Sequence, residues 1–396
     1  MNKQLNLAVA GAVLALSAVS ANAGIMIPAG DWTLDIGGVV NTYYTSTRAS
    51  GATANSPLAI GNSSGRTTSN ITTGLLPNYL SVSGKTRQND LDVGFTISLN
   101  PGVSTTQGGK QSAQQENRQA FLTFGDASWG SIKLGKDLGI YASDAILNDM
   151  TLLGVGSGAG GLAGNTTTLG RIGTGFMYAD WKSQIAYTTP NFNGFSATAG
   201  VTQSWNAVSS IGGLNSSGST LRGGSEPAFE AKASYAWAGD VAGKVWVSGI
   251  TQKVQGLNDR AESVDVGANV NVAGFGLTGY YYTGSGIGQT IQLFDGFDAL
   301  GKARDSQGGY VQGTYTIPGP GTKLGISWGR SELDRNGAGD ALGNVKDEMW
   351  TIGAYHPLTK HLNLVAEYSD VKHEVETTTT AEGKAKTISL GAILFF

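Results

Sequence analysis

An all-β fold, a transmembrane antiparallel β-barrel of about sixteen strands, is predicted by three features of the sequence. Apolar residues recur at every second position along many segments. Short connections between those segments alternate with long ones. The first residues have the pattern of a secretory signal, which indicates export from the cytoplasm. Together the three features favour a closed wall with one apolar face and one polar face.

The N-terminal segment predicts secretion. Lys3 is its only charge, the run Leu7–Leu16 contains no polar side chain, and Ala21-Asn22-Ala23 has the small-residue pattern of a cleavage site. The run is shorter than the ~20 residues that a helix needs to span a bilayer. We therefore expect a cleaved signal peptide over 1–23, rather than a buried core helix, followed by a single barrel domain over 24–396.

The composition removes several classes of function. The chain contains no cysteine, so it has neither disulfides nor a thiolate metal site. Its formal net charge of −3 provides no basic field for nucleic acid, and we expect no nucleic-acid partner. The 60 glycines are spread along the alternating segments beside 14 tyrosines and 8 tryptophans, which is typical of a β-protein with many turns and aromatic belts.

The period-two alternation is clearest in two segments. Apolar residues occupy the odd positions of 91–99 and the even positions of 264–272, with polar residues and glycine between them. This period indicates strands that bury one face. A soluble β-sandwich would show the same period, but the secretory signal and the aromatic residues near strand ends favour the membrane barrel.

The alternation predicts a full set of membrane-spanning strands. An even number in this range is typical of bacterial outer-membrane barrels, in which each strand needs ~10 residues to cross the bilayer. We expect strands at 31–48, 75–87, 91–100, 116–125, 131–139, 182–190, 195–205, 228–238, 244–255, 263–273, 277–285, 308–318, 323–333, 347–356, 362–375 and 385–396.

The lengths of the connections predict how these strands are oriented. Short periplasmic turns that alternate with long outer loops are typical of outer-membrane barrels. The last strand is expected to pair with the first and leave no open edge. Short turns are predicted at 88–90, 127–130, 191–194, 239–243, 274–276, 319–322 and 357–361. Long loops are predicted near 49–74, 101–115, 140–181, 206–227, 286–307, 334–346 and 376–384, with one shorter connection near 256–262.

Three stretches resemble the general porins of Gram-negative bacteria, the trimeric sixteen-stranded family. Glu116–Leu122 followed by Gly130–Lys136 is similar to the family run R-x-A-F … F-G-x-x-x-x-G-R. Ile185–Phe195 is similar to its strand–turn–strand pattern x-x-Y-x-S-P-x-F-x-G-F, and Leu390–Phe396 to its aromatic last strand. The order of strands and loops extends the resemblance over the rest of the chain.

The resemblance implies a function and a place in the cell. A member of this family is an outer-membrane homotrimer, surrounded by lipid, that lets small hydrophilic solutes and ions diffuse through a water-filled channel. It needs no cofactor and no metal, and it is not an enzyme. The alternatives are a barrel adhesin or receptor, which would have a plugged lumen, and a barrel hydrolase, which would need a serine–histidine or aspartate–histidine group near one rim.

The resemblance also implies a charged constriction. In the family the third long loop, here near 140–181, folds into the barrel, and its acidic groups face basic groups of the wall. Ser143–Asp149 could form a helical turn in this loop with Ser143 as its N-cap. Asn78 stands where many members have a basic residue, which is a departure from the family pattern.

The expected constriction residues come from the family positions and from strand parity. Lys133 shares the parity of Ser131 and Gly135, so we assign it to the lumen face. Arg118 matches the strand arginine of the family, Lys136 the arginine of its G-R pair, and Lys182 a frequent wall position. The expected basic residues are Arg118, Lys133, Lys136 and Lys182, and the expected acidic ones are Asp137, Asp144 and Asp149.

Overall fold

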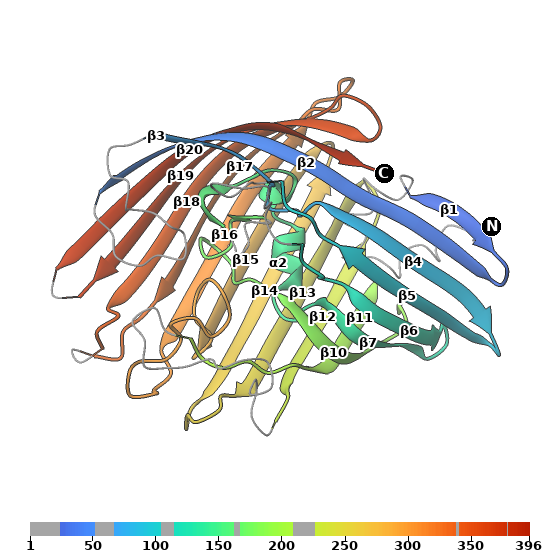
Figure 1. Cartoon of the computed structure of the whole chain (residues 1–396), viewed down its shortest axis with the longest axis horizontal. Coiled ribbons are helices and arrows are strands. Elements are labelled where there is room, and N and C mark those ends of the chain that lie inside the picture. Colours follow the sequence, from blue (N-terminus) through green and yellow to red (C-terminus); the bar gives the residue numbers. More distant parts are fainter. Residues whose placement is uncertain are drawn as a thin grey trace.

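The computed structural model shows a wide barrel of tilted strands with a short helix inside it (Figure 1). It describes residues 24–51, 67–103, 115–161, 167–208, 226–337, 340–377 and 379–396. The expected signal peptide, 1–23, lies outside the described residues. Among the described residues, no helix is long and apolar enough to cross a membrane.

Sixteen antiparallel strands close the ring, which confirms the predicted fold class and strand number. Each pairs with its neighbours along the chain, so the backbone hydrogen bonds of the wall are made mainly within the sheet. The strands of the ring are β2 (Trp32–Gly51), β4 (Tyr79–Gln88), β5 (Leu91–Leu99), β6 (Ala120–Asp126), β7 (Gly130–Leu138), β10 (Trp181–Thr188), β11 (Phe195–Thr202), β12 (Ala228–Trp237), β13 (Val241–Lys253), β14 (Arg260–Val272), β15 (Phe275–Ser285), β16 (Asp305–Thr316), β17 (Lys323–Leu333), β18 (Asn344–Pro357), β19 (Leu362–Glu376) and β20 (Thr380–Phe395).

The first strand of the ring, β2, pairs with strands from both ends of the chain. Its residues 39–51 pair with β20, in the register Val39 with Phe395. Its opposite edge pairs with β4 and, further along, with the short strand β3 (Thr67–Thr72). A further short strand, β1 (Ile25–Ala29), pairs with residues 32–36 of β2. The predicted closure of the barrel by its last strand is therefore confirmed.

The chain leaves the wall between β3 and β4. Two asparagines satisfy the backbone there: Asn41 Nδ2 donates to the Leu76 carbonyl at 2.9 Å, and the Asn78 side-chain oxygen accepts from the Asn41 amide at 2.6 Å. Leu75 inside this break donates its amide to Gly154 of the long loop. Asn78, at a position where the family often has a cation, thus binds backbone instead.

Tight turns at one end of the barrel have the backbone that their residues favour. Asn89 and Asp90, which join β4 to β5, both have positive φ, of 48° and 62°, and so do Ala273 and Gly274 between β14 and β15. Two successive residues with positive φ match the twist of a two-residue hairpin. The predicted short turns lie at this end and long connections at the other. The long loop predicted at 376–384 was wrong, because β19 extends to Glu376 and β20 begins at Thr380.

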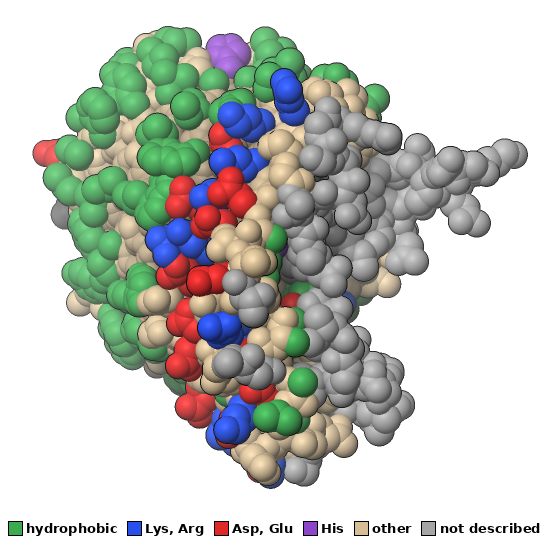
Figure 2. All heavy atoms as spheres, turned by 90° about the vertical axis from the view of Figure 1, so that its left-hand side faces the viewer, with side chains coloured by type: hydrophobic (Ala, Val, Ile, Leu, Met, Phe, Trp, Pro, Cys, Tyr) green, Lys and Arg blue, Asp and Glu red, His purple; other side chains and the backbone are tan. Residues whose placement is uncertain are grey.

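The two faces of each strand differ in polarity. On β18, Trp350 and Ile352 point outward and are about half exposed, while Met349 and Thr351 point inward and are fully buried. Figure 2 shows the resulting apolar surface of the wall, with a band of charged side chains between it and the residues that are not described. Such a belt fits a lipid environment, because large apolar patches are otherwise rare on protein surfaces.

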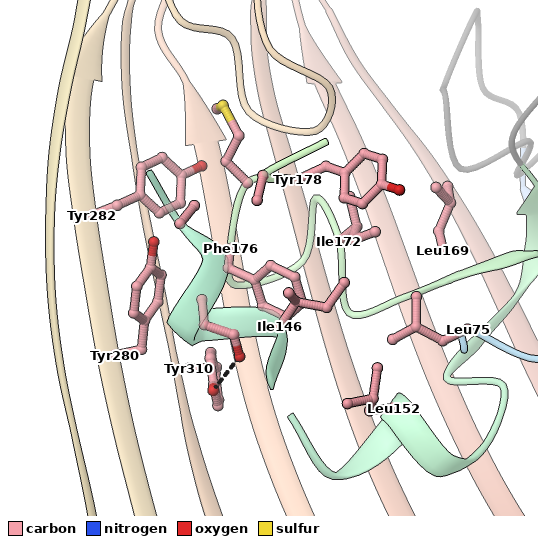
Figure 3. Close-up of a cluster of buried hydrophobic side chains, with 14 of the residues drawn as sticks. Leu75, Ile146, Leu152, Leu169, Ile172, Phe176, Tyr178, Tyr280, Tyr282 and Tyr310 are labelled. Atoms are coloured by element: carbon pink, nitrogen blue, oxygen red, sulfur yellow. Dashed lines mark hydrogen bonds between the residues drawn. The ribbon is translucent and has the colours of Figure 1, made fainter. Parts of the chain in front are cut away.

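The lumen contains the long connection between β7 and β10. It includes the helix α2 (Ser143–Leu147), the 3-10 turn η2 (Met150–Leu153), and the short strands β8 (Ser157–Gly161) and β9 (Thr168–Gly170). Its apolar residues pack with inward-facing wall tyrosines into the cluster of Figure 3. The predicted N-cap was wrong: Ala142 precedes α2 in a left-handed conformation, and the Ser143 hydroxyl donates to the Ile140 carbonyl at 2.9 Å.

Candidate functional site: the constricted lumen

A buried carboxylate on β12 holds the start of the loop. Glu230 Oε2 accepts hydrogen bonds from the amides of Ile140 and Tyr141, both at 2.8 Å. Its other oxygen accepts from Lys182 Nζ and from the Thr202 hydroxyl, both at 2.7 Å. All bonds of this carboxylate therefore lie within the protein, as a buried charge requires.

A second buried carboxylate, on β19, holds the middle of the loop. Glu367 Oε2 accepts from the amides of Val155 and Gly156, both at 2.8 Å, and Oε1 accepts from the Tyr355 hydroxyl at 2.6 Å. The adjoining Gly154 has no room for a side chain, because an added Cβ would lie 2.1 Å from the Glu367 carboxylate oxygen. Glycine at 154 thus allows the close approach of loop and wall.

Further wall side chains hold the loop between these two points. The Tyr310 hydroxyl donates to the Ala145 carbonyl at 2.8 Å, the bond drawn as a dashed line in Figure 3. Gln312 of the same strand accepts from the Met150 amide at 2.6 Å and donates to the Asn148 carbonyl at 3.1 Å. The loop is therefore fixed against β16 as well as against β12 and β19.

Asp144 of α2 meets two wall lysines that the sequence did not single out. Its carboxylate pairs with Lys232 of β12 at 3.2 Å and with Lys244 of β13. Burial alone would raise the pKa of Asp144, but the two ammonium groups outweigh it and hold the pKa below its usual value. Asp144 itself is almost fully buried, whereas both lysine side chains keep some exposed surface.

The other two expected acidic residues also lie in local pairs. Asp149 is buried, accepts from the Thr151 amide at 3.0 Å, and has its Oδ1 4.0 Å from Arg171 Nε. Burial raises the pKa of Asp149 above its usual value. Asp137 pairs with Lys133 four residues earlier and accepts from the Gln119 amide group at 3.0 Å.

The expected basic residues fall into different environments. Lys182 is enclosed with Glu230, and Lys133 lies over the Phe121 ring, with its Nζ 4.7 Å from the ring centroid. Lys136 instead donates to the Asn117 carbonyl at 2.8 Å. It pairs in the sheet with Ser183, while Lys182 pairs with Asp137, so strand alternation places Lys136 on the opposite face of the wall.

Arg118 borders the open part of the lumen. Its Nε lies 2.7 Å from Glu116 Oε2, and its guanidinium lies over the Trp181 ring at 5.7 Å. A cavity of about 310 Å³ separates the loop from the wall at this point. The loop contributes Ile146, Leu147 and Leu152 to its lining, and the wall side contributes Ser81, Ser83, Thr96, Arg118 and Gln119.

The part of the chain that the structure describes contains no candidate metal site. No group of three or more His, Asp or Glu side chains there could hold an ion. The loop and wall instead leave between them a cavity lined by apolar, polar and charged side chains.

The family model that matches the chain is described as "Gram-negative porin" and covers residues 9–375. The chain belongs to this family. It is thus an outer-membrane porin that forms a channel, as the resemblance of its motifs implied. A comparison with curated protein sequences finds no significant match.

Solved structures with the same fold are also porins or outer-membrane channels. An anion-selective porin from Comamonas acidovorans has a TM-score of 0.62 at 14% identity, covering 92% of this porin and 100% of that chain. The outer-membrane channel DcaP of Acinetobacter baumannii has a TM-score of 0.63 at 16% identity, covering 93% and 99%. OmpF of Salmonella typhi, solved with daunomycin, has a TM-score of 0.53 at 17% identity, covering 93% and 100%.

Four wall residues that matter to this site were not assigned to it from the sequence: Lys232, Lys244, Glu230 and Glu367. Lys232 and Glu230 lie on the polar face of a strand that the alternation predicted, so their inward orientation could be predicted from the sequence. The sequence could not predict which of the inward residues contact the loop, because these contacts join residues about 90 positions apart. The bonds from Ile140 and Tyr141 to Glu230 are examples.

Proposed function

We propose that this porin is a passive channel for small hydrophilic solutes and ions, with its width set by the loop between β7 and β10. The observation that carries the proposal is that two wall carboxylates, Glu230 and Glu367, bind backbone amides of this loop inside the lumen. A loop fixed at separate points of the wall gives a narrow section of constant width. Diffusion through it needs no covalent step, so we propose no enzyme activity.

Charge at the constriction is proposed to favour anions. Lys232 and Lys244 share the single carboxylate of Asp144, and both lysines keep exposed surface. The wall therefore presents more positive than negative charge there, which attracts anions. The Comamonas porin of the same fold is described as anion-selective, which supports the same preference here. Among the residues expected from the sequence, Arg118 is the first to test because it borders the cavity.

Export and assembly are proposed to follow the family. We infer that cleavage after Ala23 leaves a mature chain from Gly24, and that three copies associate in the outer membrane with lipid around them. The half-exposed apolar side chains of the wall support contact with lipid. Mass spectrometry of the mature protein tests the cleavage, and cross-linking in detergent tests the trimer. A mature chain that retains 1–23, or a monomer alone, would contradict these proposals.

Planar-bilayer recording tests the channel. The purified porin should insert in groups of three equal conductance steps, and a potassium chloride gradient should give a reversal potential toward chloride. Arg118→Glu should move that potential toward potassium without abolishing conductance. A barrel that inserts but stays silent would contradict the channel, and an unchanged potential would remove Arg118 from the constriction.

The alternative functions predict other results. A receptor or adhesin should show a plugged, non-conducting lumen. For a hydrolase, the aspartate–histidine pair among the described residues is His373 with Asp347, whose Nδ1 and Oδ1 lie 2.5 Å apart. Both side chains are enclosed, at 1% and 0% exposure, so a substrate has no access to them. Hydrolysis of ester or peptide substrates by the purified porin would support the enzyme.

A further inference from the structure

The loop presents apolar side chains, not its carboxylates, to the open cavity. Ile146, Leu147 and Leu152 line the loop side of the 310 Å³ cavity. Asp144 and Asp149 are turned away from it into ion pairs, and each has a side chain that is at most 3% exposed. The carboxylates of Asp144 and Asp149 therefore do not face the cavity.

The wall across the cavity has both polar and apolar side chains, and its lining includes Asp35, Tyr79, Phe121 and Trp181. The hydroxyls of Ser83 and Thr96 lie within 2.9 Å of each other on neighbouring strands, and Ser81 lines the same surface. Arg118 also lines this side, where its side chain is 5% exposed and is paired with Glu116. Hydroxyl and guanidinium groups both donate hydrogen bonds, which an anionic group accepts.

A cavity whose loop side is apolar discriminates by the hydrocarbon or hydroxylated body of a solute as well as by its charge. A strongly hydrated solute must give up water against Ile146, Leu147 and Leu152 without any hydrogen bond in return, and an apolar constriction resists such a solute. A solute with a hydrocarbon body buries that body against the same side chains. Each buried methylene group favours its entry by about fourfold.

We propose that this lumen selects monocarboxylates with an unsubstituted hydrocarbon chain over hydroxylated carboxylates of the same length. The carboxylate lies toward the wall hydroxyls and Arg118, and the chain lies toward Leu147 and its apolar neighbours. This inference rests on the proposed channel function, and it adds a solute class to it.

Hexanoate and gluconate form a matched pair of probes, because both are six-carbon monocarboxylates and only gluconate is hydroxylated. Their permeability ratio is measured from reversal potentials with one anion on each side of a planar bilayer. After correction for mobility in bulk water, we expect the wild-type porin to favour hexanoate by at least about fourfold, the value for one buried methylene group.

Two variants of one residue assign the effect to the loop. Leu147→Asn replaces the apolar side chain by a polar one of similar size and should return the corrected ratio to about one. Leu147→Met remains apolar and should keep the wild-type ratio. Chloride conductance is recorded in the same membranes for all three proteins.

The outcomes separate this inference from the channel itself. No chloride conductance in the wild-type protein overturns the proposed function. Normal chloride conductance with a corrected ratio of one in the wild-type protein overturns the solute class and leaves the channel standing. A high ratio that Leu147→Asn does not lower, or that Leu147→Met abolishes, overturns the role of the loop side of the cavity.

Discussion

Lys182 of β10 and Glu230 of β12 form a 2.7 Å ion pair across the strand that separates them, and neither side chain has any exposed surface. The same carboxylate binds the first amides of the lumen loop. The pair thus joins the wall to the loop instead of presenting charge to water. Removing one member of such a pair leaves the other charge buried and uncompensated.

Lys182→Met should therefore destabilise the barrel. We expect the free energy of unfolding to fall by about 3–5 kcal/mol, the usual cost of breaking a buried pair. Urea titration in lipid vesicles, followed by tryptophan fluorescence, measures it. Lys384→Met is the control, because Lys384 pairs with Glu382 on an exposed surface and should change stability by only about 1 kcal/mol or less. Equal effects of the two variants would contradict the role of burial.

Gly154→Ala should displace the loop. An alanine Cβ would lie 2.1 Å from the Glu367 carboxylate, so either the loop or that side chain must move. We expect a loss of about 1–3 kcal/mol in stability, typical of overpacking, and an altered single-channel conductance. Gly279→Ala on β15 is the matched control, because nothing lies within 4 Å of the position of its Cβ. A conductance unchanged in both variants would show that the bond between Glu367 and the loop does not set the width.

Acid should loosen the helix α2. The pKa of Asp144 is lowered in the folded protein, so its bonds to the wall lysines contribute stability above the unfolded value and lose it as pH falls below about 4. We expect open-channel noise to increase as the pH falls through this range. Asp144→Asn, which cannot titrate, should show the same noise at all pH values. A wild-type trace that stays quiet in acid would refute the role of this carboxylate.

Neutralising the two lysines beside Asp144 should weaken the anion preference. In the wild-type porin, the two lysines outnumber the one carboxylate of Asp144 that they contact. The double variant Lys232→Gln with Lys244→Gln leaves only that negative charge. The reversal potential in a potassium chloride gradient should move toward potassium. Lys253→Gln is the control, because Lys253 has a half-exposed side chain paired with Glu226 outside the constriction. The same shift in both proteins would point to general surface charge.

The strands could be predicted because their signal is local. Alternation along 91–99 depends only on neighbouring residues, and the observed strand, Leu91–Leu99, agrees with it within one residue. Parity with Ser131 and Gly135 likewise placed Lys133 on the inner face, and its observed sheet partner, Ala186, is buried. The last strand was predicted at 385–396 and its pairing with β2 is confirmed, but the observed strand, Thr380–Phe395, begins five residues earlier.

The site was harder to predict because its contacts are long-range. Asp144 was expected to face wall cations, but the position of Lys232 beside it depends on the path of the whole loop. Ser143 was expected as an N-cap from its residue type alone. The backbone before α2 instead takes a left-handed residue at Ala142, whose amide donates to the Ser248 hydroxyl at 3.1 Å. A wall contact therefore overrides the local preference.

The closure of the ring between β2 and β20 has a consequence for biosynthesis. Val39 finds its partner, Phe395, only after nearly the whole chain has been made, and pairings so distant in sequence form slowly. Until then one edge of β2 has no neighbour over residues 39–51 and could recruit another chain. The hairpin of β1 pairs with residues 32–36 of that same edge, so the stretch that waits for β20 begins only beyond it.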